Sequence, residues 1–255
     1  MPYVDSEGVR IHYVDEGVGP AIVLIHGFAS SLEGNWRATG VIDALVRSGR
    51  RVVAVDCRGH GESEKPHDPA QYAGTVMADD VIRVLDVARV PYADLMGYSM
   101  GGYIAASLLV RHPQRFRSAI LAGVGEMVER GGPDPERSRR IAEALAAPSI
   151  DAVTDPLGQQ FRRFAERNGN DLLALAAMQR SERAGFPREA LAQLRMPVLV
   201  LVGADDALAR GAQRLADRIP TASLRTVRGD HLTAVNEEYI EAVLSFLAEV
   251  SPVPV

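Results

Sequence analysis

The feature that most constrains this chain is a G-x-S-x-G pattern, Gly97-Tyr98-Ser99-Met100-Gly101. Residues 91–96 before it predict a short buried strand, and residues 103–110 after it predict a helix. A strand that turns into a helix within a few residues needs glycine where a Cβ does not fit, and a glycine stands on each side of Ser99. The pattern therefore predicts a sharp strand-to-helix turn that holds out the Ser99 hydroxyl as a nucleophile.

A serine nucleophile needs a base and a carboxylate that orients the base, and two later strands deliver candidates for both. Residues 196–202 predict a buried strand that ends before Asp205 and Asp206, and a strand over residues 223–227 ends shortly before His231. The carboxyl ends of parallel strands lie at one edge of a sheet, so these side chains are expected near Ser99.

The donors for an oxyanion are expected from two backbone N–H groups. The unbroken apolar run over residues 21–25 predicts a strand covered on both faces, and it ends at His26-Gly27-Phe28. Glycine there lets the chain turn N–H groups toward a ligand, so Phe28 is one predicted donor. Met100, the residue after the nucleophile, is the second.

Two other histidines, His26 and His60, are alternative bases. His26 is interpreted as a turn residue that hydrogen-bonds the backbone, and His60 as a histidine that braces its loop, since no later carboxylate is placed to orient it. The single cysteine, Cys57, excludes an internal disulfide and is interpreted as a small buried apolar residue.

The rest of the chain alternates strands and helices around a long helical block. Residues 9–16 predict an edge strand that opens a hairpin through a turn at residues 17–20, and further strands are predicted over residues 51–56 and 118–122. Helices are predicted over residues 35–46, 72–90, 211–219 and 235–250.

No buried strand is indicated between Gly123 and Pro187, where helices are predicted over residues 136–147, 156–167 and 171–184. This predicts an α/β core of residues 1–122 and 188–255, with residues 123–187 forming a helical cap over the carboxyl edge of the sheet. Apolar cap residues that could line a pocket are Met127, Phe161, Phe164, Leu172, Leu175 and Met178.

Five motifs together resemble the α/β-hydrolase fold family, in its serine esterase and lipase-like branch. They are His26-Gly27-Phe28, the loop Asp56 to Ser63, the Ser99 turn, Gly203-Ala204-Asp205-Asp206 and Asp230-His231. The resemblance implies a mostly parallel sheet flanked by helices, with the cap inserted after the sixth strand.

The resemblance also implies a catalytic triad of Ser99, Asp206 and His231. The family usually places its acid at the last position of G-x-x-D, which favours Asp206 over Asp205, and Glu126 is a minor alternative. Asp230 replaces the glycine that usually precedes the histidine, and its charge is hypothesised to raise the pKa of His231.

The function implied is hydrolysis of carboxylic esters with small or medium acyl groups, without a metal or organic cofactor. Serine at the nucleophile position disfavours the branches that attack by carboxylate, the haloalkane dehalogenases and epoxide hydrolases. A lactonase, a C–C bond hydrolase, a thioesterase or a perhydrolase would use the same triad, and a non-catalytic ligand receptor is a further alternative.

The net charge and the composition of the segments argue against nucleic-acid binding and membrane association. The net charge of -5, from 28 basic and 33 acidic side chains, argues against nucleic acid as a partner. The first residues do not resemble a signal peptide and no apolar run approaches a membrane span, so no membrane partner and a cytoplasmic location are expected.

Overall fold

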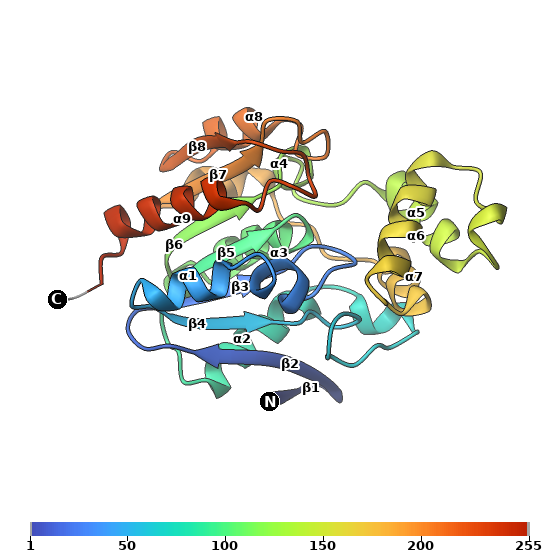
Figure 1. Ribbon diagram of the computed structural model, residues 1–255, viewed down its shortest axis with the longest axis horizontal. Coiled ribbons are helices and arrows are strands. Elements are labelled where there is room, and N and C mark those ends of the chain that lie inside the picture. The colour runs from blue at the N-terminus through green and yellow to red at the C-terminus, as the bar shows by residue number, and fades with distance from the viewer. Residues whose placement is uncertain (1, 254–255) are drawn as a thin grey trace.

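The computed structural model describes residues 2–253. Met1 and residues 254–255, which fall within the predicted core ranges, lie outside the described residues. Figure 1 shows one central sheet, helices packed on both of its faces, and a helical lobe beyond one end of the strands. The predicted architecture, a mostly parallel sheet flanked by helices with a helical cap after the sixth strand, is confirmed.

Within the described residues the sheet has eight strands in the spatial order β1-β2-β4-β3-β5-β6-β7-β8. They are β1 (Tyr3–Ser6), β2 (Val9–Glu16), β3 (Ala21–Ile25), β4 (Arg51–Val55), β5 (Ala93–Tyr98), β6 (Phe116–Ala122), β7 (Val198–Gly203) and β8 (Ala222–Val227). Strands β3 to β8 are mutually parallel, and every residue of β3, β5 and β7 is buried. Parallel strands covered on both faces require such continuous apolar sequences.

The predicted hairpin between residues 9–16 and 21–25 is wrong. Strand β2 pairs antiparallel with β1 and with β4, whereas β3 pairs parallel with β4 and β5. The turn at residues 17–20 therefore connects strands that are not neighbours in the sheet. Alternation of apolar and polar residues predicts which face of a strand is buried. It does not predict the neighbouring strand, because strand pairing depends on contacts with residues distant in the sequence.

Helices cover both faces of the sheet and form the cap. The helices of the described residues are α1 (Val41–Arg47), α2 (Val76–Val87), α3 (Met100–Arg111), α4 (Glu126–Glu129), α5 (Pro135–Ala146), α6 (Pro156–Arg167), α7 (Leu172–Arg180), α8 (Ala212–Arg218) and α9 (Glu237–Val250), with short helical turns η1 (Glu33–Arg37), η2 (Pro69–Tyr72), η3 (Pro113–Arg115), η4 (Ile150–Ala152) and η5 (Arg188–Gln193). Helices α1 and α9 share one apolar cluster with Ile22 and Leu24, whereas α2, α3 and α8 share another with Val23 and Ile25. Within residues 2–253 no helix has both the length and the hydrophobicity of a bilayer-spanning segment.

Two predicted helices are shorter than their apolar patterns suggest. Residues 35–46 fall into η1 and α1, separated at Gly40, which has φ 79°. Helix α2 begins only after Gly74, which has φ 64°. A left-handed residue cannot continue a right-handed helix, so each glycine limits the helix beside it.

The cap comprises α5, α6 and α7 with η4, and these three helices lie beyond the carboxyl ends of the strands (Figure 1), whereas α4 and η5 contact helices of the core. Asp134, Asp155 and Asp171 cap the N-termini of α5, α6 and α7 through hydrogen bonds from backbone N–H groups. The two ends of the cap meet where the Phe186 N–H donates to the Gly131 carbonyl at 3.0 Å. The carboxyl edge of the sheet is thus covered by one helical unit.

Candidate active site

Ser99 occupies the turn between β5 and α3 with φ 54° and ψ −112°, a backbone conformation that residues other than glycine rarely adopt. Tight packing holds this turn. A Cβ on Gly97 would collide with the Gly101 carbonyl, and a Cβ on Gly101 would collide with the Ile25 carbonyl of β3. The two glycines therefore let α3 start directly against the sheet, which leaves the Ser99 side chain at its carboxyl edge.

Substituting Gly101 with alanine should destabilise the fold strongly. The added methyl group meets backbone rather than a side chain that can move, so about 3 kcal/mol or more of unfolding free energy should be lost. For a chain of this size that lowers Tm by roughly 6 to 12 °C in a thermal scan. Gly132→Ala is the matched control, since its Cβ would have only one neighbour, 4.0 Å away. Equal Tm values for the two variants would contradict this packing.

Ser99, His231 and Asp206 form a continuous hydrogen-bonded chain. The Ser99 Oγ lies 2.8 Å from His231 Nε2, and His231 Nδ1 lies 2.8 Å from Asp206 Oδ2. With Nδ1–H donating to the carboxylate, Nε2 is left to accept the serine proton. The geometry thus gives each of the three residues the position that the sequence predicted for it.

The Asp206 carboxylate is held from both sides. Its side chain is 0% exposed, and Oδ1 accepts hydrogen bonds from the N–H groups of Leu208 and Ala209 at 2.9 and 3.0 Å. Asp205 is exposed, and Glu126 pairs with Arg214. Of the three acids considered from the sequence, only Asp206 reaches the imidazole.

Tyr98 fixes the loop that carries the histidine. Its hydroxyl donates to the His231 carbonyl at 2.7 Å, and the two rings lie 5.3 Å apart. Since Tyr98 is the last residue of β5, directly before Ser99, this bond ties the β8–α9 loop to the nucleophile turn. The separation between serine and histidine is therefore set by rigid neighbours as well as by their own hydrogen bond.

Phe28 and Met100 line the same pocket as Ser99, and no hydrogen bond from either backbone N–H group to an acceptor within residues 2–253 is found. The loop before Phe28 is well fixed. The Gly27 N–H donates to Asn35 Oδ1 at 2.9 Å, and His26 Nδ1 donates to the Gly27 carbonyl at 2.7 Å. Two free donors on a fixed loop and at the start of α3 suit an oxyanion hole.

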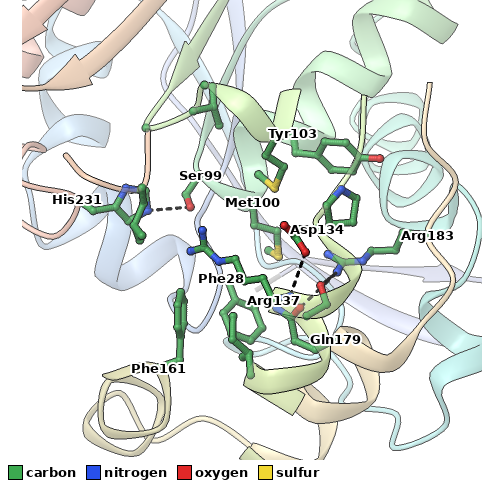
Figure 2. Close-up of a pocket in the computed structure, with 18 of the residues that line it drawn as sticks. Phe28, Ser99, Met100, Tyr103, Asp134, Arg137, Phe161, Gln179, Arg183 and His231 are labelled. Carbon is green, nitrogen blue, oxygen red and sulfur yellow. Dashed lines mark hydrogen bonds between the residues drawn. The ribbon is translucent and has the colours of Figure 1, made fainter. Parts of the chain in front are cut away.

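A divided pocket opens on both sides of Ser99, as Figure 2 shows for the side toward the cap. The inner arm, about 100 Å³, is lined by Met100, Tyr103, Met127, Arg137, Met178 and Arg183. The outer arm, about 430 Å³, is lined by Asn35, Thr39, Phe164, Asn168, Leu232 and Val235. Both arms reach Ser99 and His231 and share Phe28 and Phe161, so a substrate at Ser99 can extend in two directions.

Four of the six predicted pocket residues line these arms: Met127, Phe161, Phe164 and Met178. Leu175 is instead buried in the apolar cluster between the cap helices, where Leu172 also packs. Arg137, Gln179 and Arg183 were not predicted from the sequence, and they lie in the inner arm beside the apolar residues. Nothing in the local pattern separates these polar residues from the solvated face of a cap helix.

The model of the α/β-hydrolase fold family matches residues 20–147, half of the chain and the part that contains the Phe28 loop and the Ser99 turn. This chain is an α/β-hydrolase.

Proteins similar to this α/β-hydrolase carry different hydrolase names. A 2-hydroxymuconate semialdehyde hydrolase of Pseudomonas sp. (strain CF600) is 36% identical over 202 residues, an alignment that covers 75% of this chain and 65% of that protein, less than two thirds of its length. A hydrolase from Pseudomonas aeruginosa PA01 has 28% identity and TM-score 0.77, with 96% of this chain and 97% of that one covered. A thermophilic esterase from Thermogutta terrifontis has 25% identity and TM-score 0.76, with 98% and 99% covered.

The other two candidate bases of this α/β-hydrolase, His26 and His60, form hydrogen bonds with backbone groups of nearby loops. Beside its bond to Gly27, His26 accepts from the Cys57 N–H through Nε2 at 3.0 Å, and His60 Nδ1 donates to the Arg58 carbonyl at 3.0 Å. Burial lowers the pKa of both histidines, to about 3 for His60. Burial also raises the pKa of the Cys57 thiol well above its usual value. Within residues 2–253 no group of three or more His, Cys, Asp or Glu residues is placed to hold a metal ion.

Asp230, which precedes the histidine, directs its carboxylate into its own turn. Oδ1 accepts from the Thr233 hydroxyl at 2.8 Å and from the N–H groups of Leu232 and Thr233 at 2.9 and 3.0 Å. These bonds, led by that of the Thr233 hydroxyl, lower the pKa of Asp230. The carboxylate is thus engaged in the turn that holds His231 rather than with the imidazole.

Replacing Asp230 with asparagine should leave the pH–rate profile close to that of wild type, because an exposed charge pair contributes little. Its effect on stability should depend on pH. The pKa of Asp230 is lower in the folded protein than in the unfolded chain, where it is about 4. The ionised aspartate therefore stabilises the fold at pH values above about 4, and this contribution is lost as the pH falls through the folded-state pKa. The urea midpoints of wild type and variant should therefore differ at pH 7 and converge below about pH 4. A shift of a full pH unit in the rate profile would instead support the charge hypothesis.

Proposed function

We propose that this α/β-hydrolase cleaves carboxylic esters with small or medium acyl groups through an acyl-enzyme on Ser99. The single observation that carries the proposal is the hydrogen-bonded chain from Ser99 Oγ through His231 to Asp206, with both bonds at 2.8 Å. It supplies a nucleophile, a base and a group that offsets the charge formed on the imidazole.

The reaction follows from these contacts. His231 Nε2 takes the Ser99 proton as Oγ attacks the ester carbonyl, and the Phe28 and Met100 N–H groups bind the oxygen that becomes negative. The imidazolium then gives its proton to the leaving alcohol. Water, deprotonated by the same histidine, attacks the acyl carbonyl, and Ser99 leaves with the proton returned to it. No step draws on a metal or an organic cofactor.

A C–C bond hydrolase is the second candidate, because the 2-hydroxymuconate semialdehyde hydrolase matches three quarters of the chain. A serine at the elbow argues against attack by carboxylate, as in epoxide hydrolases. The cap lines the inner arm and part of the outer arm, so we propose that substrate selectivity resides there.

The test is release of p-nitrophenol from acetate and butyrate esters, together with mass spectrometry of the protein after a fluorophosphonate label. The proposal expects turnover of these esters and a single adduct on the peptide that contains Ser99. Turnover of a vinylogous diketone without ester turnover would favour the C–C hydrolase. Absence of turnover across a broad ester and thioester panel would favour a ligand receptor.

A further inference from the structure

Two arginines enter the inner arm from the cap without a carboxylate partner. Arg137 comes from α5, and Arg183 follows α7 on the other side of the arm. In Figure 2 the Arg137 side chain extends toward Ser99, while Arg183 enters from the opposite wall. Within residues 2–253 neither guanidinium lies within 4.0 Å of a carboxylate oxygen.

Arg183 is bound by neutral groups only. Its Nη2 donates to Ser138 Oγ at 3.3 Å and to Gln179 Oε1 at 3.4 Å, and its Nε is buried with no hydrogen-bond partner in the described residues. Burial lowers the pKa of Arg183, which reflects the loss of water around the charge. A desolvated cation with an unused donor is costly to keep, unless a ligand completes its contacts.

Arg137 is similarly incomplete. Its guanidinium lies over the Phe161 ring at 5.6 Å from the centroid, and burial lowers its pKa. The carboxylate in this wall, Asp134, accepts from the Arg137 backbone N–H at 3.1 Å and lies 3.6 Å from Arg130 Nη1. Arg130 pairs with Asp134. The charges of Asp134 and Asp206 favour the charged form of Arg137, but neither carboxylate forms an ion pair with its guanidinium within residues 2–253.

We infer that the inner arm binds a carboxylate group of the substrate, so that the preferred substrates are short esters that carry a second, ionised carboxyl group. This inference rests on the proposed function, since it names the substrate class of that site. A guanidinium matches a carboxylate with two parallel N–H groups, and the bond is stronger in a site that excludes water. The small volume of the arm suits a chain of a few carbons between the two carboxyl groups.

The kinetic test compares monomethyl glutarate with methyl pentanoate, in which a methyl group replaces the carboxylate. Wild type should favour the anionic ester in kcat/KM by about tenfold to a hundredfold, the range expected for a charge-assisted hydrogen bond. Arg137→Gln and Arg183→Gln should each lower this ratio about tenfold, and Arg183→Lys should give an intermediate ratio. Arg180→Gln is the matched control, because Arg180 is exposed on α7 and lies outside the inner arm. A wild-type ratio near one would overturn the inference and leave the esterase proposal standing.

A binding test separates the subsite from the chemistry. Glutarate titrated calorimetrically into Ser99→Ala protein should bind, and pentanoate should bind at least tenfold more weakly. The double variant Ser99→Ala/Arg183→Gln should lose the difference, with an unchanged Tm showing that the cap is folded. Glutarate binding without any ester turnover would refute the proposed function and support the carboxylate subsite, whereas equal affinity for the two compounds would refute the subsite.

Discussion

Replacing Ser99 with alanine should lower kcat for p-nitrophenyl butyrate by about 10⁵ to 10⁶-fold. The substitution removes the Ser99 Oγ, the proposed nucleophile, which lies 2.8 Å from His231 Nε2. His231, Asp206 and the two N–H donors remain, so any residual rate comes from transition-state binding and an unactivated water. Rates should be measured with enough protein to detect a 10⁶-fold loss.

The fold should survive this change. Alanine keeps a Cβ in the same backbone conformation, so the Tm is expected within a few degrees of wild type. Ser223→Ala, at an exposed position of β8, is the matched control and should retain full activity. If the Ser99 variant kept more than a hundredth of the wild-type rate, the hydrolysis would have to proceed without an acyl-serine.

Replacing Asp206 with asparagine should lower kcat by about 10⁴-fold. The amide NH₂ would donate to His231 Nδ1, which moves the imidazole proton to Nε2 and leaves no acceptor for the serine proton. The remaining amide oxygen can still accept from the Leu208 and Ala209 N–H groups, so the loop should hold its shape.

Asp205→Asn is the comparison that separates the two neighbouring acids. Asp205 is exposed, so Asp205→Asn should change kcat by less than tenfold. The Tm of Asp206→Asn should equal that of wild type, which would show that its loss of activity is not caused by unfolding. Equal losses of kcat in the two variants, or a greater loss in Asp205→Asn, would contradict the assignment of the orienting role to Asp206. The measurement is kcat at pH 7 with p-nitrophenyl butyrate.

The site was predictable where chemistry follows from local chain geometry. Glycines on each side of Ser99 mark a strand-to-helix turn, and polar residues after buried strands mark one edge of the sheet. The structure brings Ser99, Asp206 and His231 together at that edge, and their catalytic roles stay predictions. The β1–β2 pairing was missed and the hairpin to β3 was wrong, because partner strands are chosen by contacts distant in sequence.

The charges of the inner arm could not be found from the sequence. Arg137 belongs to an amphipathic helix with many arginines, and its neighbour Arg139 is 57% exposed and pairs with Glu136 and Glu143. Only the packing of α5 and α7 over the sheet decides which arginine faces Ser99. The same packing buries Leu175 and leaves Phe161 at the pocket wall.

The meeting of the two cap ends at Gly131 and Phe186 has an evolutionary consequence. A segment whose entry and exit lie side by side can be replaced by recombination without separating the strands that carry Ser99, Asp206 and His231. Selectivity and bond-breaking chemistry can therefore diversify at different rates in such a lineage, and a chimera that exchanges residues 131–186 with those of a relative should inherit the donor's substrate range.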